Sequence, residues 1–323
     1  MPPLSISLRD IAFFGNGLNR PECVLCTAKG YIYCADWRGG VTRLDPDGRR
    51  QAFLATNTGI DIRPNGIALC RDGSFLLANL GDDGGLYRLR RTGALETVLT
   101  AVEGFRLPPA NFVLIDANDR IWLTVSTRRT PRALGYRPDV SDGFIVLQDR
   151  RGARIVADGL GYTNEVQIDA SGQWLYVNET FGRLLSRFRI SADGALGGRE
   201  TVAEFGPGTY PDGLTFDAEG GIWITSIVSN RVIRISPDGF QHVVLEDSDP
   251  EHVATAEKAF RAGTMDRRHL DNIKSRRLRN ISSLAFGGSD LKTVYLGCLL
   301  GDSLATFRSP IAGRPPAHWF FDG

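Results

Sequence analysis

The chain has 323 residues, 42% of them hydrophobic, and a formal net charge of +1 at pH 7. The hydrophobic share is enough for a packed core, and the basic residues are scattered singly, which argues against a nucleic-acid partner. No apolar stretch approaches the ~20 residues that a membrane-spanning helix needs. We therefore expect a globular protein with no nucleic-acid partner and no membrane partner.

The beginning of the chain carries no basic segment followed by an apolar run, so we expect no secretory signal and a cytoplasmic location. Five cysteines, an odd number, favour reduced thiols. Cys23 and Cys26 form a C-x-x-C pattern, but they fall on an expected strand, where residues three apart point to opposite faces. Buried apolar thiols are the expected result, in place of a redox or zinc site.

Residues 4–9, LSISLR, alternate like a strand but precede every repeated unit. In a closed ring of sheets, such a strand would complete the last sheet and remove an exposed edge. We therefore expect residues 4–9 to join the two ends of the chain.

One hairpin pattern recurs along the chain, and residues 210–225, YPDGLTFDAEGGIWIT, show it most clearly. Apolar residues alternate with small or polar ones on both sides of a glycine-containing turn, which is typical of two strands. A hairpin cannot bury its apolar face alone, so each unit needs neighbours. The polar residues that lead the units are Glu22, Asn65, Asn111, Asn164, Asp212 and Ser282.

The spacing between these leading residues is 43, 46, 53, 48 and 70 positions. Self-similarity near this period, with about four strands in each repeat, is typical of a β-propeller. We predict an all-β fold, a six-bladed β-propeller that uses residues 1–323 as one domain. An open sandwich of many hairpins is the alternative, but it does not explain six aligned units.

Two insertions interrupt the repeat. Residues 127–142 separate the second and third strands of the third unit, and their prolines and arginines predict a loop that covers one face as a lid. Residues 246–279 precede the sixth unit and contain a helix signal, with Asp249 as N-cap, Pro250 as first helical residue and Gly263 as the stop. We expect this second insertion to pack as a short surface helix.

The leading residues are expected to converge on one mouth of the central channel, because the innermost strands of a propeller surround it. They offer two carboxylates, three amides and a hydroxyl, the oxygen donors that a hard cation such as Ca²⁺ prefers. Two carboxylates that face each other without a cation would be costly. Asn or Asp before Gly also favours turns, and this alternative stays open, although Glu22 and Asn111 precede no glycine.

Over essentially its full length the chain resembles the SMP-30, gluconolactonase and LRE-like six-bladed propellers. The resemblance is carried by Pro21-Glu22, by Asn164 and by the PDGL of residues 211–214. It implies that Glu22, Asn164 and Asp212 bind a metal, commonly Ca²⁺, with Zn²⁺, Mn²⁺ and Mg²⁺ as alternatives. It also implies that Asn111 joins the metal ligands or holds substrate beside them.

The chain departs from sugar-lactonase members of this family at three positions. Those members typically have Arg two residues before the Asn that matches Asn111 and Asp after it, where this chain has Pro109 and Phe112. Glu165 follows Asn164 where many members have Gly. The loss of an arginine and the gain of apolar neighbours favour a larger or less polar ester or lactone.

We therefore predict a divalent-metal-dependent hydrolase of the lactonase or esterase type, a monomer or homodimer whose partner is a small-molecule lactone or ester. Asp212 is expected to be catalytic, as general base or as the ligand that orients the attacking water. The residues expected to bind substrate are Asn65, Asn111, Phe112, Arg128 and Tyr136. A phosphotriesterase-like hydrolase on the same metal site and a non-catalytic ligand-binding propeller are the alternatives.

Overall fold

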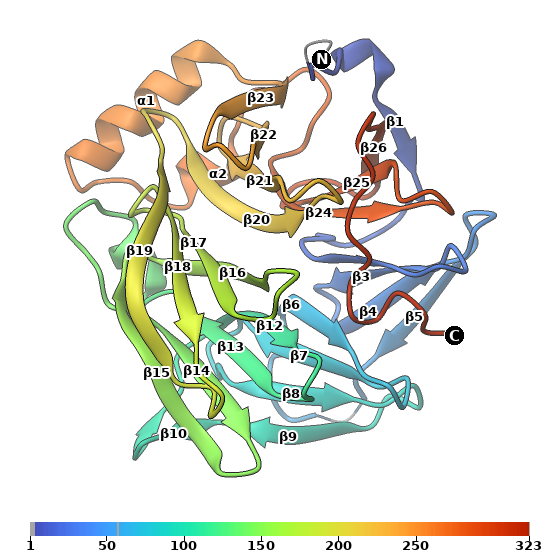
Figure 1. The fold of residues 1–323 in the computed structure, drawn as a ribbon, viewed down its shortest axis with the longest axis vertical. Helices are drawn as coiled ribbons and strands as arrows, with labels where there is room; N and C mark the ends of the chain where they lie inside the picture. The colour runs from blue at the N-terminus through green and yellow to red at the C-terminus, as the bar shows by residue number, and fades with distance from the viewer. Residues whose placement is uncertain (1–3, 57, 323) are drawn as a thin grey trace.

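Six four-stranded antiparallel sheets stand around a central channel in the computed structural model (Figure 1). The structure describes residues 4–56 and 58–322, so the first three residues, on which part of the signal-peptide expectation falls, lie outside it. The innermost strands contact one another in ring order, and the last contacts the first. The fold is the predicted six-bladed β-propeller.

The blades follow the chain, each running from the channel outward. The first two are β2–β5 (Val24–Cys26, Ile32–Asp36, Gly40–Leu44, Arg50–Leu54) and β6–β9 (Pro64–Leu69, Phe75–Asn79, Leu86–Leu89, Leu95–Leu99). The next two are β12–β15 (Ala110–Ile115, Ile121–Val125, Gly143–Asp149, Gly152–Leu160) and β16–β19 (Thr163–Ile168, Trp174–Glu179, Leu184–Ile190, Leu196–Glu204). The fifth is β20–β23 (Tyr210–Phe216, Ile222–Ile227, Arg231–Ile235, Gln241–Glu246), and a small hairpin, β10–β11 (Ala101–Val102, Phe105–Arg106), follows the second.

The sixth blade joins the two ends of the chain. It consists of β24–β26 (Ile281–Gly287, Thr293–Cys298, Leu304–Arg308) and β1 (Ala12–Phe14), which pairs with β26 as its outer strand. The expected closure is therefore confirmed, but the expected strand at residues 4–9 is wrong. Residues Leu8–Asp10 form a 3-10 turn, and Leu4, Ile6 and Leu8 pack against an apolar cluster shared by the fifth and sixth blades. Their alternation reflects burial of one side, not pairing in the sixth sheet.

The glycines that follow Asn65 and Asp212 let neighbouring blades approach each other. A Cβ added to Gly66 would lie 2.6 Å from the Cα of Phe112, and one added to Gly213 would lie 2.6 Å from the Cα of Ser283. Both glycines lie inside innermost strands, β6 and β20, so they do not form turns. The interpretation of Asn-Gly and Asp-Gly as turn signals is therefore wrong for these two units.

Gly66→Ala is expected to lower the free energy of unfolding by about 1–3 kcal/mol, because its methyl group would overpack the contact between two blades. Urea unfolding would measure the change. Gly206→Ala is the matched control, since a Cβ there meets nothing within 4 Å. Equal stability of the two variants would contradict the close-approach explanation.

The cysteines behave as buried apolar residues. All five lie in the described part of the chain as free, buried thiols. Cys23 packs in a different apolar cluster from Cys26, and burial raises the pKa of both thiols well above the usual range. The structure thus confirms the apolar interpretation of the C-x-x-C pattern.

Among the described residues, no helix has the length and apolar character needed to cross a membrane.

Both insertions lie where the sequence predicts them. The first, between β13 and β14, contains the 3-10 helix η2 (Arg132–Gly135). The second contains α1 (Pro250–Arg261) and α2 (Arg268–Asp271) between β23 and β24, and α1 lies at the rim of the ring in Figure 1. An Asp249 carboxylate oxygen accepts the His252 N–H at 2.7 Å, and Gly263 has a φ of 67° just after the helix. The predicted cap and stop of α1 are confirmed.

Candidate metal and substrate site

Bulges in the innermost strands place the predicted site residues. The pairing of each of β6, β12, β16, β20 and β24 with its neighbour is interrupted near its start. The interruptions contain Asn65, Asn111, Asn164, Asp212 and Ser282, and Glu22 lies just before β2. A bulge breaks the alternation of a strand and re-aims side chains. Each blade therefore presents one of these residues at an equivalent place.

The structure brings Glu22, Asn164 and Asp212 together from three blades. All three side chains are buried. Burial raises the pKa of Asp212 well above its usual range, and the Glu22 carboxylate raises it further, while Arg20, Asn164 and Arg132 act in the opposite direction. A carboxylate oxygen of Glu22 accepts a hydrogen bond from Arg20 Nε at 2.8 Å. Two buried carboxylates thus repel each other at the place where the sequence predicts a cation.

Three asparagine oxygens at this ring have no donor. The Oδ1 atoms of Asn65, Asn111 and Asn164 are buried, and no hydrogen bond reaches them within the described residues. The Asn164 amide nitrogen donates to Thr180 Oγ1 at 2.9 Å, and that of Asn65 donates to the Asn111 carbonyl oxygen at 3.1 Å, which leaves their oxygens free. A buried acceptor without a partner costs about 1–3 kcal/mol.

This donor set fits a hard divalent cation. Ca²⁺ binds carboxylate and amide oxygens together, and its coordination number of about 6–8 leaves room for water or substrate. Throughout residues 4–56 and 58–322, no group of three or more His, Cys, Asp or Glu side chains is arranged to hold a metal. A cation here would therefore need the amide oxygens as well as Glu22 and Asp212.

Sequence reasoning missed Glu165 as a site residue. Its side chain is buried, and one carboxylate oxygen accepts the Leu214 N–H at 2.9 Å. Burial raises its pKa well above the usual range, and the charges of Asp212 and Glu22 raise it further. The available signal was a carboxylate directly after Asn164. In a regular strand Glu165 would point to the face opposite Asn164, but both residues lie in the same interruption of β16.

Sequence reasoning also missed Arg20 and Arg267, which lie near the carboxylates, whereas Arg132 belongs to the insertion that was expected to cover the site as a lid. Arg20 lies with its guanidinium 3.9 Å from the Trp37 ring. Burial lowers the pKa of Arg20, Glu22 opposes this, and the positive charges of Arg267 and Arg132 lower it further. Burial acts to lower the pKa of Arg132 as well, but Tyr162 and Tyr136, and after them Glu22 and Asp212, raise it overall. Arg132 and Arg267 come from the two insertions, so both insertions face this site.

The structure does not support the expected role of Arg128 in substrate binding. Its guanidinium binds both carboxylate oxygens of Asp158, at 2.7 and 2.9 Å, and lies 4.3 Å from the Phe144 ring. Asp158 belongs to β15, the outermost strand of its blade. The guanidinium is therefore paired with a carboxylate of the outer strand of its blade.

Phe112 and Tyr136 also differ from expectation. Phe112 packs in the apolar cluster that joins the first four blades, so its side chain is part of the core and does not line a substrate pocket. Tyr136 is only 1% exposed and lies 4.6 Å from Phe181, ring centre to ring centre. Tyr136 supports the first insertion from within, which leaves little of it to contact a substrate.

The two insertions share one apolar cluster. Tyr136 from the first packs with Phe260, Met265 and Leu270 from the second, together with Tyr210 at the start of β20. Glu257 of α1 fastens the second insertion to the ring, because it pairs with Arg183 and accepts the Gly208 N–H at 3.1 Å. The insertions thus form one roof beside Glu22 and Asp212.

Glu257→Gln is expected to lower the free energy of unfolding by about 1–3 kcal/mol at pH 7, since breaking this charge pair leaves Arg183 without its partner. Burial acts to raise the pKa of Glu257, but hydrogen bonds from Arg183 and Arg261 lower it to about 2. A carboxyl with a lowered folded pKa stabilises the protein above its unfolded pKa of ~4.3, and this contribution is lost as the pH falls toward about 2.

Urea unfolding at pH 7 and pH 3 would measure the difference between the Glu257→Gln variant and the original protein. The difference should shrink at pH 3. Glu251→Gln, on the exposed face of the same helix, is the matched control and should change stability by less than about 1 kcal/mol. An unchanged difference at pH 3 would contradict the charge pairing.

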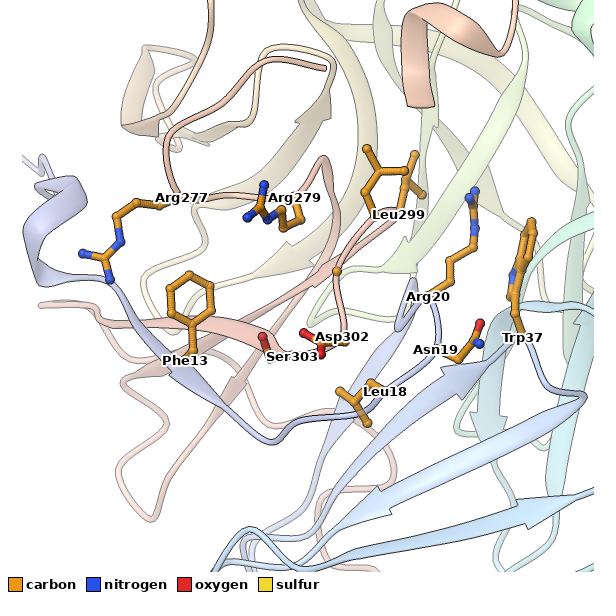
Figure 2. A pocket seen from close by; sticks show the side chains of 12 residues that line it. Phe13, Leu18, Asn19, Arg20, Trp37, Arg277, Arg279, Leu299, Asp302 and Ser303 are labelled. Atoms are coloured by element: carbon orange, nitrogen blue, oxygen red, sulfur yellow. The ribbon is translucent and has the colours of Figure 1, made fainter. Parts of the chain in front are cut away.

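Two adjoining cavities lie beside the arginines near this site. One, of about 650 Å³, is lined by Arg20 and Trp37 on one side and by Phe13, Arg277 and Arg279 on the other (Figure 2). The second, of about 290 Å³, is lined by Trp37, Arg63, Arg132 and Arg267 among others. Trp37 borders both cavities, which places them side by side. Glu22, Asn164 and Asp212 themselves line neither cavity, and Arg20, which binds Glu22, connects the larger one to them.

Known proteins resemble this chain in sequence and in fold. Residues 21–250 match the profile of the SMP-30/Gluconolactonase/LRE-like region. The chain is 29% identical over 281 residues to a 6-deoxy-6-sulfogluconolactonase from Pseudomonas putida, covering 85% of this chain and 81% of that protein.

Two solved structures show the same fold. A gluconolactonase from Xanthomonas campestris superposes with a TM-score of 0.67 at 18% identity, covering 93% of this chain and 89% of that one. A calcium-binding protein, regucalcin, from Agrobacterium tumefaciens gives 0.61 at 16% identity, covering 100% and 95%. Because the profile matches most of its length, the chain belongs to the SMP-30/gluconolactonase/LRE-like family.

Proposed function

We propose that this protein is a divalent-metal-dependent lactonase, with Ca²⁺ as the preferred ion and Glu22, Asn164, Asp212 and Asn111 as its ligands. The observation that carries the proposal is the ring of buried oxygens. Asn111 and Asn164 keep acceptor oxygens without donors, beside the two carboxylates of Glu22 and Asp212, which raise each other's energy. A cation removes both costs at once.

The names of the relatives support the reaction class. The relative from Pseudomonas putida is named for a sulfonated gluconolactone, and the Xanthomonas campestris structure is described as a gluconolactonase. The Agrobacterium tumefaciens structure is described as calcium-binding. These descriptions agree with a lactone substrate and a calcium ion, while the oligomeric state and the cytoplasmic location stay predictions.

The residues would divide the chemistry as follows. Asp212 would accept a proton from the water that attacks the lactone carbonyl carbon. The bond between that carbon and the ring oxygen would then break, and the ring oxygen would take up a proton to give the open hydroxy acid. A bound Ca²⁺ would supply Lewis acidity toward the carbonyl oxygen. Asn65 and Asn111 would hold substrate oxygens, and the roof would limit access of bulk water.

The structure weakens the grounds for the sequence-based preference for a less polar substrate. That preference rested on the loss of an arginine two residues before Asn111 and on apolar neighbours of Asn111, but the Phe112 side chain packs into the core and other arginines lie nearby. The residues that line the two cavities include Arg20, Arg63, Arg132 and Arg267. We therefore propose a polar lactone in place of a larger, less polar ester.

A substrate panel tests this proposal. After treatment with EDTA, the protein would be assayed for acid release from δ- and γ-aldonolactones, with Ca²⁺, Mn²⁺, Zn²⁺ or Mg²⁺ added back. Aryl esters and a phosphotriester would test the alternative hydrolases. We expect metal-dependent opening of an aldonolactone. Phosphotriester cleavage with no lactone opening, or no activity with any substrate and metal, would contradict it.

A further inference from the structure

We propose that Arg132 and Arg267 form a subsite for an anionic substituent of the substrate, such as a sulfonate, phosphate or carboxylate remote from the reacting carbonyl. The reaction assigned to that substrate rests on the proposed lactonase function, whereas binding of the anion does not. The two arginines belong to separate insertions, η2 and α2, and both line the 290 Å³ cavity beside Trp37.

Arg132 has no counter-ion of its own. Its side chain is partly exposed in the cavity, and its guanidinium makes no hydrogen bond or ion pair with any described residue. By contrast, Arg128, Arg129 and Arg137 from the same insertion each pair with an aspartate. Arg132 is therefore the arginine of this insertion that is left to meet a ligand.

The nearby carboxylates do not fill this role. Glu22 is paired with Arg20 at 2.8 Å, and Asp212 is a proposed metal ligand whose charge the cation would neutralise. Asp61, on the wall of the same cavity, is paired with Arg63 at 2.7 Å. Asp82 also lines the cavity but is exposed to solvent, which weakens its field. An anion between the two arginines would find positive charge in excess.

Arg267 is already oriented for a second contact. Asp271 accepts hydrogen bonds from its Nε at 3.1 Å and its Nη2 at 2.6 Å, one turn further along the chain. This pair fixes the plane of the guanidinium and leaves Nη1 for a ligand. The positive charge of Arg132 acts to lower the pKa of Arg267, so the two guanidinium groups repel each other. Each of them also lowers the pKa of Arg20. A bound anion would relieve this repulsion.

The position of this subsite defines the shape of the substrate. Trp37 lies between the two cavities, and Arg20 stacks on it while holding Glu22. A lactone whose carbonyl reaches Glu22 and Asp212 would extend along Trp37 toward the two insertions. Its anionic group would therefore sit at the end of the molecule away from the ester bond.

Binding can be measured without any reaction. Isothermal titration would compare gluconate with 6-phosphogluconate, open-chain acids that differ only in the terminal phosphate. We expect the original protein to bind 6-phosphogluconate ~10–100-fold more tightly, the range of one or two hydrogen bonds between charged groups. Arg132→Gln and Arg267→Gln should each lose most of this preference and change gluconate binding less than ~3-fold.

Arg132→Lys and Arg137→Gln complete the set. The Arg132→Lys variant keeps the positive charge and should retain part of the preference for 6-phosphogluconate over gluconate. It also replaces Arg132→Gln in the comparison if that variant fails to fold. Arg137→Gln removes an exposed arginine of the same insertion that pairs with Asp139, and it should change neither affinity. Equal affinity of the original protein for the two acids, or equal losses for both acids in the variants, would overturn the subsite.

Kinetics separate the subsite from the proposed function. The original protein would be assayed with glucono-δ-lactone and with its 6-phospho derivative. Preference for the phosphorylated acid in titration, with neither lactone opened, would keep the subsite and reject the lactonase function. Equal opening of both lactones, with no preference in titration, would keep the lactonase function and reject the subsite.

Discussion

Replacing Asp212 with asparagine is expected to lower kcat for lactone opening by ~10²–10⁴-fold, the usual contribution of a general base. Asparagine keeps an oxygen ligand and the shape of the side chain but cannot accept a proton. Asp212 is buried at the ring, and without a cation both burial and the Glu22 carboxylate raise its pKa. Steady-state rates over a range of Ca²⁺ concentrations would measure the effect.

The calcium dependence separates the two possible roles of Asp212. If the residue only helped to bind metal, excess Ca²⁺ would restore the rate, because mass action overcomes weakened binding. If Asp212 is the base, the rate stays low at saturating metal. Recovery of the Asp212→Asn variant to nearly the original rate in excess Ca²⁺ would contradict the assignment of Asp212 as base.

Glu22→Gln is expected to weaken Ca²⁺ binding by at least ~10–100-fold, because it removes one of the two carboxylate charges proposed to face the ion. Glutamine can still accept the hydrogen bond from Arg20, which Glu22 now accepts at 2.8 Å. Saturating Ca²⁺ should restore at least part of the rate, unlike in the Asp212→Asn variant. Titration of activity against Ca²⁺ would measure this, and a loss of kcat that no amount of Ca²⁺ relieves would give Glu22 a direct catalytic role instead.

The sequence was sufficient wherever the signal is local. Turn residues and alternating apolar residues predicted the blades, and the cap at Asp249 and the stop at Gly263 predicted the ends of α1. The equivalent positions of Glu22, Asn164 and Asp212 in three repeats were enough to bring them together, because the symmetry of the ring converts equal register into nearness.

The sequence failed where the outcome depends on a partner far along the chain. Nothing local shows that Arg128 has Asp158 as its partner while Arg132 has none. The alternation at residues 4–9 predicted a strand, but Ile6 donates one backbone hydrogen bond to Val244 and the sixth sheet pairs with residues 12–14 instead. The bulges are the largest source of error in placing site residues. Asn111 and Glu165 lie in bulges, where side chains no longer alternate between the two faces of the sheet as strand prediction assumes.

Binding of Ca²⁺ to the metal-free protein tests the central claim most directly. Isothermal titration of EDTA-treated protein should show about one ion bound per chain, the number that a single ring of ligands from several blades can hold. Binding should weaken in the Glu22→Gln variant and be lost when Asn164→Ala is added. Absence of binding for Ca²⁺, Mn²⁺, Zn²⁺ and Mg²⁺ alike, in a protein that still opens lactones in EDTA, would contradict the metal site.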